Sequence, residues 1–138
     1  MKILSCDLGK NYGWCFLDDT GMESGHGEQT NLVDWGDQFK ALLDKWKPGI
    51  VVLSQTNNFG YWAAARSGCM LAGIAFYICG KKDIPGVEFN DSSARKAVFG
   101  KALKKKEVQS LFPKIDFDEL DAQILAKGWQ KLQKDSQP

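Results

Sequence analysis

The sequence predicts an α/β domain in which a mixed five-stranded sheet is flanked by helices, and three observations carry this prediction. Strand-like segments separated by turn residues fill the first 29 positions. Residues 49–54 (GIVVLS) form a short apolar run between turn residues, which is typical of a strand buried on both faces of a sheet. Apolar residues recur at three- and four-residue spacing between Leu32 and Trp46, which indicates an amphipathic helix. Strands and helices in this order build a layered α/β domain.

The first three predicted strands cover residues 2–8, 12–18 and 22–29 and form an antiparallel meander, because turn residues separate them. A helix over 32–46 follows and is stopped by Pro48 and Gly49. The remaining expected elements are a strand over 49–54, a long Ala-rich helix over 61–79, a strand over 85–89, a short helix that is capped by Asn90 or Asp91 and runs to about Phe99, and helices over 104–112 and 117–133.

The size and composition of the chain suit one globular domain over residues 1–138. Hydrophobic residues make up 43% of the 138 positions, enough for a single core. No apolar stretch reaches the roughly 18–20 residues that a membrane span needs, and the first residues lack a signal-peptide pattern. We therefore expect a cytoplasmic protein with no membrane partner.

Charge is distributed unevenly along the chain although the formal net charge is only +1. Residues 16–37 carry six acidic side chains and no Lys or Arg. The segment 95–106 carries six basic side chains and no acidic one, namely Arg95, Lys96, Lys101, Lys104, Lys105 and Lys106. This asymmetry predicts one face that binds an anion. The alternative is a solvated helical surface.

Three carboxylates at the two ends of the chain are the best candidates for chemistry. Asp7 ends the first predicted strand, and Asp118 and Asp121 lie three apart and so share a face of the last helix. Divalent cations prefer carboxylate oxygens, and two such ions about 3.5–4 Å apart can assist phosphodiester cleavage. Taken singly, Asp7 could be a turn former, Asp118 an N-cap, and the acidic run an ordinary helix start. Together they predict a metal-dependent nuclease.

Three segments resemble motifs of the RuvC family of Holliday junction resolvases, within the RNase H-like superfamily. They are ILSCDLGKNYGW, NDSSARKAVFGKALKKKEVQSLF and DELDAQILA, and the likeness runs over nearly the whole chain. It implies an RNase H-like fold and a homodimeric endonuclease that resolves four-way junctions with paired, symmetric nicks. It further implies that Asp7, Asp118 and Asp121 bind two Mg²⁺ ions, with Mn²⁺ able to substitute, and that Lys105 or an immediate neighbour contacts the scissile phosphate.

Position 55 departs from the family pattern, which has Glu just after the fourth strand where this chain has Gln55. An amide offers a carbonyl oxygen to a cation but brings no charge. We therefore expect Gln55 to occupy a catalytic and metal-ligand position while impairing the site. An engineered exchange and a natural divergence both account for Gln55, and the intact remaining motifs favour the former.

The resemblance also implies contacts to branched DNA. The loop TNNFGYW would enter the junction centre, where Phe59 would stack on a base, with Tyr61 and Trp62 as reserves. A place in the core is the alternative for all three. Arg66 and the basic segment 95–106 would contact backbone phosphates without sequence preference.

Two other classes of protein stay open at this point. One is a different RNase H-like nuclease, such as a YqgF-like protein, acting on branched DNA or on RNA. The other is a non-catalytic junction-binding protein, which Gln55 makes conceivable. His26, the single histidine, is expected on a hairpin or surface without a catalytic role. Neither a cleavage-sequence preference nor a helicase partner can be read from the sequence.

Overall fold

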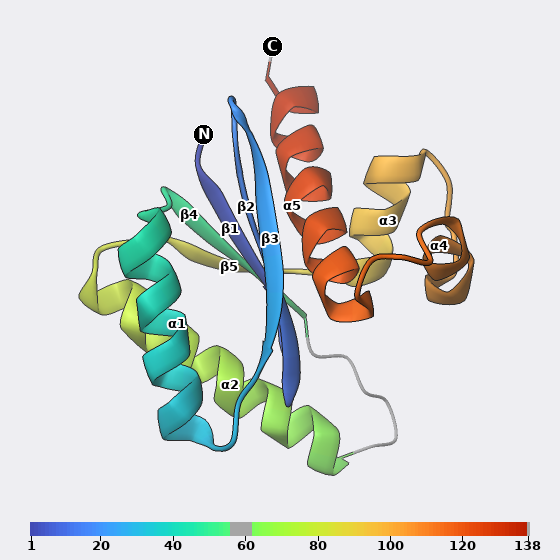
Figure 1. Cartoon of the computed structure of the whole chain (residues 1–138). Helices are drawn as coiled ribbons and strands as arrows, with labels where there is room; N and C mark the ends of the chain where they lie inside the picture. Colours follow the sequence, from blue (N-terminus) through green and yellow to red (C-terminus); the bar gives the residue numbers. More distant parts are fainter. Residues whose placement is uncertain (56–61, 138) are drawn as a thin grey trace.

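The computed structural model describes residues 1–55 and 62–137 and confirms the predicted α/β architecture (Figure 1). Its elements, in chain order, are β1 (Ile3–Asp7), β2 (Asn11–Asp18), β3 (Gly21–Glu28), α1 (Leu32–Trp46), β4 (Ile50–Ser54), α2 (Trp62–Lys81), β5 (Gly86–Phe89), α3 (Asp91–Phe99), α4 (Lys105–Leu111) and α5 (Phe117–Asp135). None of the helices in the described part of the chain combines the length and apolarity that crossing a bilayer requires.

The five strands form one mixed sheet in the order β3-β2-β1-β4-β5. Strands β1, β2 and β3 pair antiparallel as the predicted meander. Strand β4 pairs parallel with β1, and β5 pairs parallel with β4. The carboxyl ends of β1, β4 and β5 therefore lie at the same edge of the sheet.

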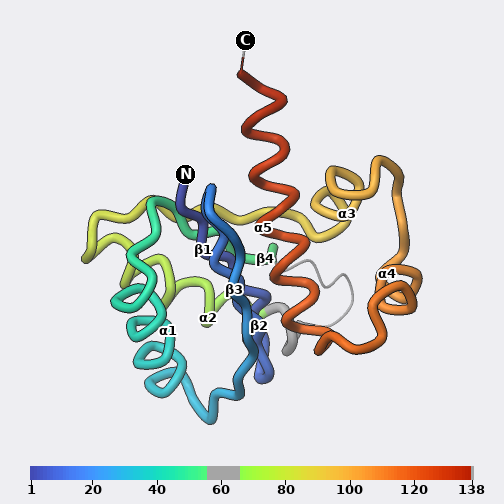
Figure 2. The backbone as a smooth tube through the Cα atoms, turned by 45° about the horizontal axis from the view of Figure 1, so that its top comes forward, coloured from blue at the N-terminus to red at the C-terminus, as the bar shows by residue number. Residues whose placement is uncertain are grey.

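Helices cover both faces of the sheet (Figures 1 and 2). Helices α1 and α2 lie on one face, and α5 lies on the other, with α3 packed beside it. The apolar core is correspondingly divided into two clusters. Trp35 and Phe39 of α1 and Leu71 of α2 belong to the first, whereas Leu120 and Leu125 of α5 belong to the second.

The helix ends refine what the sequence predicts. Helix α1 ends at Trp46, two residues before Pro48, because Lys47 adopts a left-handed conformation with φ 48° and its N–H donates to the Leu43 carbonyl. Asn90 caps α3, as one of the two expected residues. Asp116 caps α5 by accepting from the N–H groups of Asp118 and Glu119. The alternative that Asp118 is the N-cap is therefore wrong, and its side chain is available for another role.

Helix α5 lies unusually close to the sheet at Gly13 of β2. A Cβ atom added at Gly13 would lie 1.9 Å from the backbone oxygen of Asp118. One turn later, the buried hydroxyl of Ser5 in β1 donates a hydrogen bond of 2.6 Å to the Ala122 carbonyl. These two contacts fix the first turns of α5 over β1 and β2.

We predict that Gly13→Ala destabilises the fold and displaces the start of α5. The Cβ would meet backbone, which no side-chain rotation can relieve, so the free energy of unfolding should fall by about 1–3 kcal/mol. Thermal or urea unfolding measures the change. Gly49→Ala is the control, since its Cβ would make ordinary contact at 3.6 Å. Equal stability of the two variants would show that α5 does not depend on Gly13.

Candidate metal centre and nucleic-acid interface

Asp7 and Asp118 are brought together by the contact between β2 and α5. Asp7 is the last residue of β1, and its partner across the antiparallel pair is Gly13. Gly13 in turn touches the backbone of Asp118. The side chains of Asp7 and Asp118 are within hydrogen-bonding reach of each other. The structure therefore unites the first strand and the last helix as the sequence predicts.

Asp121 completes the predicted group one turn further along α5. Its side chain is only 7% exposed. Its Oδ2 atom is buried and makes no well-aligned hydrogen bond within the described residues. The Nζ atom of Lys105, the first residue of α4, lies 3.0 Å from this oxygen. The ammonium group is thus the counter-charge of a buried carboxylate, which places Lys105 beside the acidic residues.

The carboxylates of the site raise one another's pKa values. Burial raises the pKa of Asp7 to about 8, and the negative charges of Asp91, Asp121 and Asp118 add to the effect, while Lys105 opposes it. Burial and neighbouring carboxylates also raise the pKa of Asp91 and of Asp118. For Lys105, burial lowers the pKa, but the contact with Asp121 and the surrounding charges raise it overall. The site concentrates negative charge that a cation would relieve.

A cavity of about 560 Å³ lies at this edge of the sheet. Asp7, Gln55 and Lys105 contribute to its lining. Gln55 is exposed at the end of β4, where its backbone N–H donates to the Phe89 carbonyl at 3.0 Å. The position that departs from the family pattern therefore borders the same cavity as Asp7, one of the three predicted carboxylate ligands.

The donor set fits a hard divalent cation, because its members are carboxylate oxygens and the buried Asp121 oxygen already has a positively charged group 3.0 Å away. As the side chains stand, no group of three or more His, Cys, Asp or Glu residues within 1–55 and 62–137 is arranged to hold a metal ion. In the place of such an ion, the structure has the Lys105 ammonium beside Asp121.

The other predicted DNA-binding residues differ in where they lie. Arg95 lines the cavity, and its Nε donates to the Leu103 carbonyl at 3.0 Å. Arg66 is exposed in the first turns of α2. Phe59 and Tyr61 lie outside the described residues. The four remaining basic residues are exposed on or beside α3 and α4 and are not part of the cavity lining, namely Lys96, Lys101, Lys104 and Lys106.

Asp91 is a residue of the site that the sequence analysis considered only as a helix cap. It lines the cavity and is the first residue of α3. The signal for its location was its place directly after the fifth strand, because parallel strands end at one edge of a sheet.

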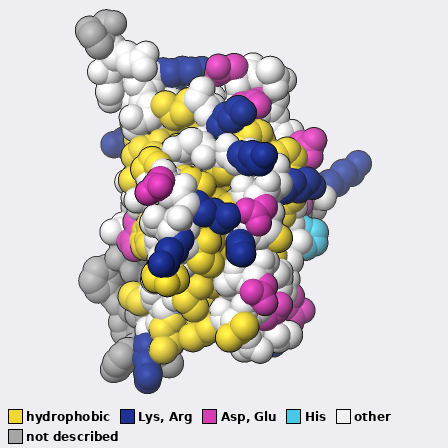
Figure 3. Space-filling model, turned by 90° about the vertical axis from the view of Figure 1, so that its left-hand side faces the viewer, with side chains coloured by type: hydrophobic (Ala, Val, Ile, Leu, Met, Phe, Trp, Pro, Cys, Tyr) yellow, Lys and Arg dark blue, Asp and Glu magenta, His cyan; other side chains and the backbone are white. Residues whose placement is uncertain are grey.

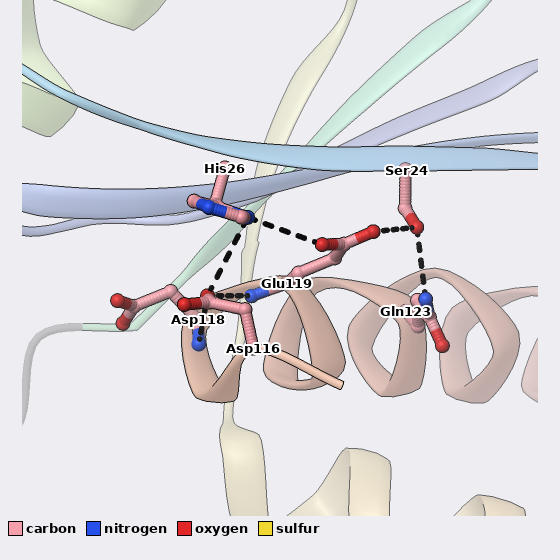
Figure 4. Close-up of polar contacts among 6 residues, drawn as sticks. All are labelled: Ser24, His26, Asp116, Asp118, Glu119 and Gln123. Carbon is pink, nitrogen blue, oxygen red and sulfur yellow. Dashed lines mark hydrogen bonds and ion pairs between the residues drawn. The ribbon is translucent and has the colours of Figure 1, made fainter. Parts of the chain in front are cut away.

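A polar cluster ties β3 to α5 beside the site (Figure 4). The His26 Nδ1 atom lies 3.2 Å from Glu119 Oε2 and 3.9 Å from Asp116 Oδ1. The Ser24 hydroxyl donates to Glu119 at 2.6 Å and accepts from Gln123 at 2.8 Å. The hydrogen bond to Glu119 and the charge of Asp116 raise the pKa of His26. His26 thus lies on a strand of the β2–β3 hairpin, where it helps to hold the start of α5.

The side chain of Asp118 does not take part in this cluster. Its carboxylate points away from His26, whereas the Glu119 side chain points toward it (Figure 4). Neighbouring residues of one helical turn therefore divide two tasks: Glu119 attaches the helix to β3, and Asp118 faces Asp7.

Known proteins resemble this chain in part of its sequence and in its fold. No protein-family model matches the chain. An 85-residue stretch is 31% identical to the crossover junction endodeoxyribonuclease RuvC of Thermomicrobium roseum, and the match spans 60% of this chain and about half (52%) of that protein. The structure of T. thermophilus RuvC in complex with a Holliday junction substrate matches 99% of this chain and 96% of its own, with a TM-score of 0.80 at 10% identity.

Two eukaryotic or viral structures are also similar. The yeast mitochondrial Holliday junction resolvase has a TM-score of 0.66 at 16% identity, covering 96% of this chain and 78% of its own. The fowlpox virus resolvase in complex with Holliday junction DNA has a TM-score of 0.57 at 16% identity, covering 96% and 99% of the two chains. The class defined by fold and site is therefore the RNase H-like fold in its RuvC form. The chain is similar in sequence to RuvC over the matched stretch, and it shares the fold of the compared Holliday junction resolvases.

We predict that Asp7→Asn stabilises the protein in a metal chelator at pH 8. The folded state holds a proton on Asp7 up to about pH 8, whereas the unfolded carboxyl loses it near 3.8, so the free energy of unfolding falls as pH rises between these values. The amide removes this loss, and Tm at pH 8 should rise by several degrees.

Below about pH 4 the difference between wild type and Asp7→Asn should disappear, because Asp7 is then protonated in both states. Asp37→Asn, an exposed exchange on α1, is the control and should show no such pH dependence. A lower Tm of Asp7→Asn at pH 8 would contradict the assigned burial of negative charge.

Proposed function

We propose that this chain is a metal-dependent endonuclease that resolves four-way DNA junctions by paired, symmetric nicks. The observation that carries the proposal is the convergence of Asp7, Asp118 and Asp121 beside Lys105 at the edge of a cavity. The sequence similarity to RuvC and the shared fold of the two compared complexes with junction DNA support it. Such a role places the protein with DNA in the cytoplasm of a bacterium or of a phage-infected host.

The carboxylates would hold two Mg²⁺ ions, for which Mn²⁺ can substitute. When bound, the ions supply charge stabilisation for the attacking and leaving oxygens of the phosphodiester. Asp7 contributes from the strand edge, and Asp118 and Asp121 contribute from one helical face. Because its side chain is 53% exposed, Lys105 can reach a phosphate oxygen from the solvent side of Asp121.

The basic residues around the cavity would bind DNA through its phosphates. Arg95 lines the cavity, and Lys104 and Lys106 are exposed on either side of Lys105. Lys96, Lys101 and Arg66 would extend this contact, and Phe59 is proposed to stack on a base at the branch point. Binding through phosphates predicts little sequence selectivity and a steep dependence on salt.

Cleavage of a labelled four-way junction by wild type and Asp118→Asn tests the proposed activity. We expect Mg²⁺-dependent paired nicks from wild type and at least a 100-fold lower rate from Asp118→Asn, because the amide keeps the shape but removes a charge. Asp37→Asn should cleave like wild type. Equal rates for Asp118→Asn and wild type would contradict the assigned ligand.

Cleavage assays with other substrates, and with a variant at position 55, distinguish the remaining functional alternatives. Faster cleavage of flaps, forks or RNA would support a different RNase H-like nuclease. Tight junction binding without nicking by both wild type and Gln55→Glu would support a non-catalytic junction-binding protein. If Gln55 alone impairs the site, Gln55→Glu should raise the nicking rate strongly.

We further propose a homodimer formed through α2, since two symmetric incisions require two related sites. The face of α1 and α2 shows a band of hydrophobic side chains that is interrupted and bordered by charged side chains of both signs (Figure 3). Leu71 and Ala75 of α2 face the core, whereas Met70 and Tyr77 are 43% and 66% exposed. Gly73 is exposed between these two residues, which allows a second helix to approach closely.

Sedimentation of wild type and Tyr77→Glu tests the dimer. The new charge would be buried against its symmetry mate, so we expect the dissociation constant of the dimer to rise at least tenfold. Met22→Glu, at an exposed position of β3, is the matched control and should leave the dimer intact. A monomeric wild type at micromolar concentration would contradict the proposed interface.

A further inference from the structure

We propose that Asp91 supplies the carboxylate that position 55 lacks, so that Asp7, Asp91, Asp118 and Asp121 together hold the divalent cations. This inference rests on the proposed metal-dependent function and deepens it. It changes the expected consequence of Gln55, because the negative charge is then moved to a neighbouring element instead of being lost.

Backbone pairing places Asp91 next to position 55. Strands β4 and β5 run parallel with Ser54 opposite Phe89, and the Gln55 N–H bonds the Phe89 carbonyl at 3.0 Å. The chains leave the sheet side by side, and the Asn90 amide donates to the Gln55 side chain at 3.4 Å. Asp91 is the next residue, and it lines the same cavity as Gln55 and Asp7.

Packing of α3 against α5 brings Asp91 toward the other carboxylates. Gly128 of α5 allows this approach, because a Cβ there would lie 2.9 Å from the Ala94 carbonyl oxygen. Asp91 and Asp121 consequently line one small pocket between the two helices.

Helix capping does not account for this side chain. Asn90 already fills the N-cap role by accepting from the N–H groups of Ser92 and Ser93. Asp91 at the first helical position gains from the helix dipole, but an exposed orientation would serve that purpose equally well. Instead it is half-buried and shares its pocket with Asp121, whose buried Oδ2 atom has the Lys105 ammonium 3.0 Å away. A positively charged group thus already lies against this oxygen, where a metal ion would bind.

Charge balance gives the physical reason for a fourth carboxylate. Two divalent cations carry four positive charges, and Asp7, Asp118 and Asp121 supply three negative ones. Gln55 adds none, whereas Asp91 supplies a fourth, and the nearby Lys105 ammonium, which adds a further positive charge, increases the need for it. An uncompensated charge in a partly buried site is costly, so losing Asp91 should weaken cation binding more than losing an ordinary surface acid.

Mn²⁺ titration of the full chain without DNA, followed by electron paramagnetic resonance, tests the inference through affinity. We expect Asp91→Asn to weaken Mn²⁺ binding at least tenfold, as loss of an anionic ligand should. Adding Gln55→Glu to Asp91→Asn should restore the affinity. Gln55→Glu alone should change it much less than in the Asp91→Asn background. Asp37→Asn is the matched control, and thermal unfolding in chelator verifies that each variant is folded.

Several outcomes would overturn the inference. Wild-type affinity in a folded Asp91→Asn variant would do so while leaving the proposed function intact, provided that Asp118→Asn still loses Mn²⁺. An equal, strong gain from Gln55→Glu in both backgrounds would also do so, and would support an impaired site at position 55. Absence of Mn²⁺ binding by wild type itself would instead remove the proposed metal-dependent function, and the inference with it.

Discussion

The contact between the first turn of α5 and Gly13 of β2 is the constraint on which the site depends. It places the backbone of Asp118 where any side chain on Gly13 would stand, directly across the strand pair from Asp7. The hydroxyl of Ser5 holds the next turn through the Ala122 carbonyl. Residues more than a hundred positions apart are thereby brought together by backbone contact, and the geometry of the carboxylates follows from the position of one helix.

Neighbouring residues stabilise the resulting cluster of carboxylates, whose own negative charges repel one another. Lys105 compensates the buried charge of Asp121 at 3.0 Å, and burial raises the pKa of Asp7 to about 8. Glu119 and His26 attach α5 to β3 on the side away from Asp118. A divalent cation would relieve the repulsion among the acids, so cation binding and stability should be linked. The same charges that make the site suitable for metal make it unfavourable without metal.

Much of this arrangement could be predicted from the sequence, because it depends on local patterns. The apolar run ending at Ser54, the meander before it and the helix after Leu32 have characteristic periods, and their order implies the fold. Asp118 and Asp121 were predicted to share a helical face because of their spacing. That Asp7 should meet Asp118 and Asp121 was expected because three carboxylates suit divalent cations and because of the resemblance to a family, since no local pattern relates residues so far apart.

The parts that escaped prediction depend on tertiary contacts. Asp91 looked like a residue at a helix start, and only the parallel pairing of β4 with β5 shows that it borders the cavity. The importance of Gly13 was equally hidden, although a glycine within a strand can signal close backbone approach. The contact between Lys105 and Asp121 depends on how α4 follows α3. Position 55 also acquires a different meaning once its neighbours are known, because a charge absent there can be supplied from the adjacent strand end.

A crystal structure with Mn²⁺, using the anomalous signal of the metal, tests the central claim most directly. The account predicts Mn²⁺ bound at roughly 2 Å from carboxylate oxygens of Asp7 and of α5, with the Lys105 ammonium displaced from Asp121. Mn²⁺ bound elsewhere, with the ammonium still in contact with Asp121, would contradict it.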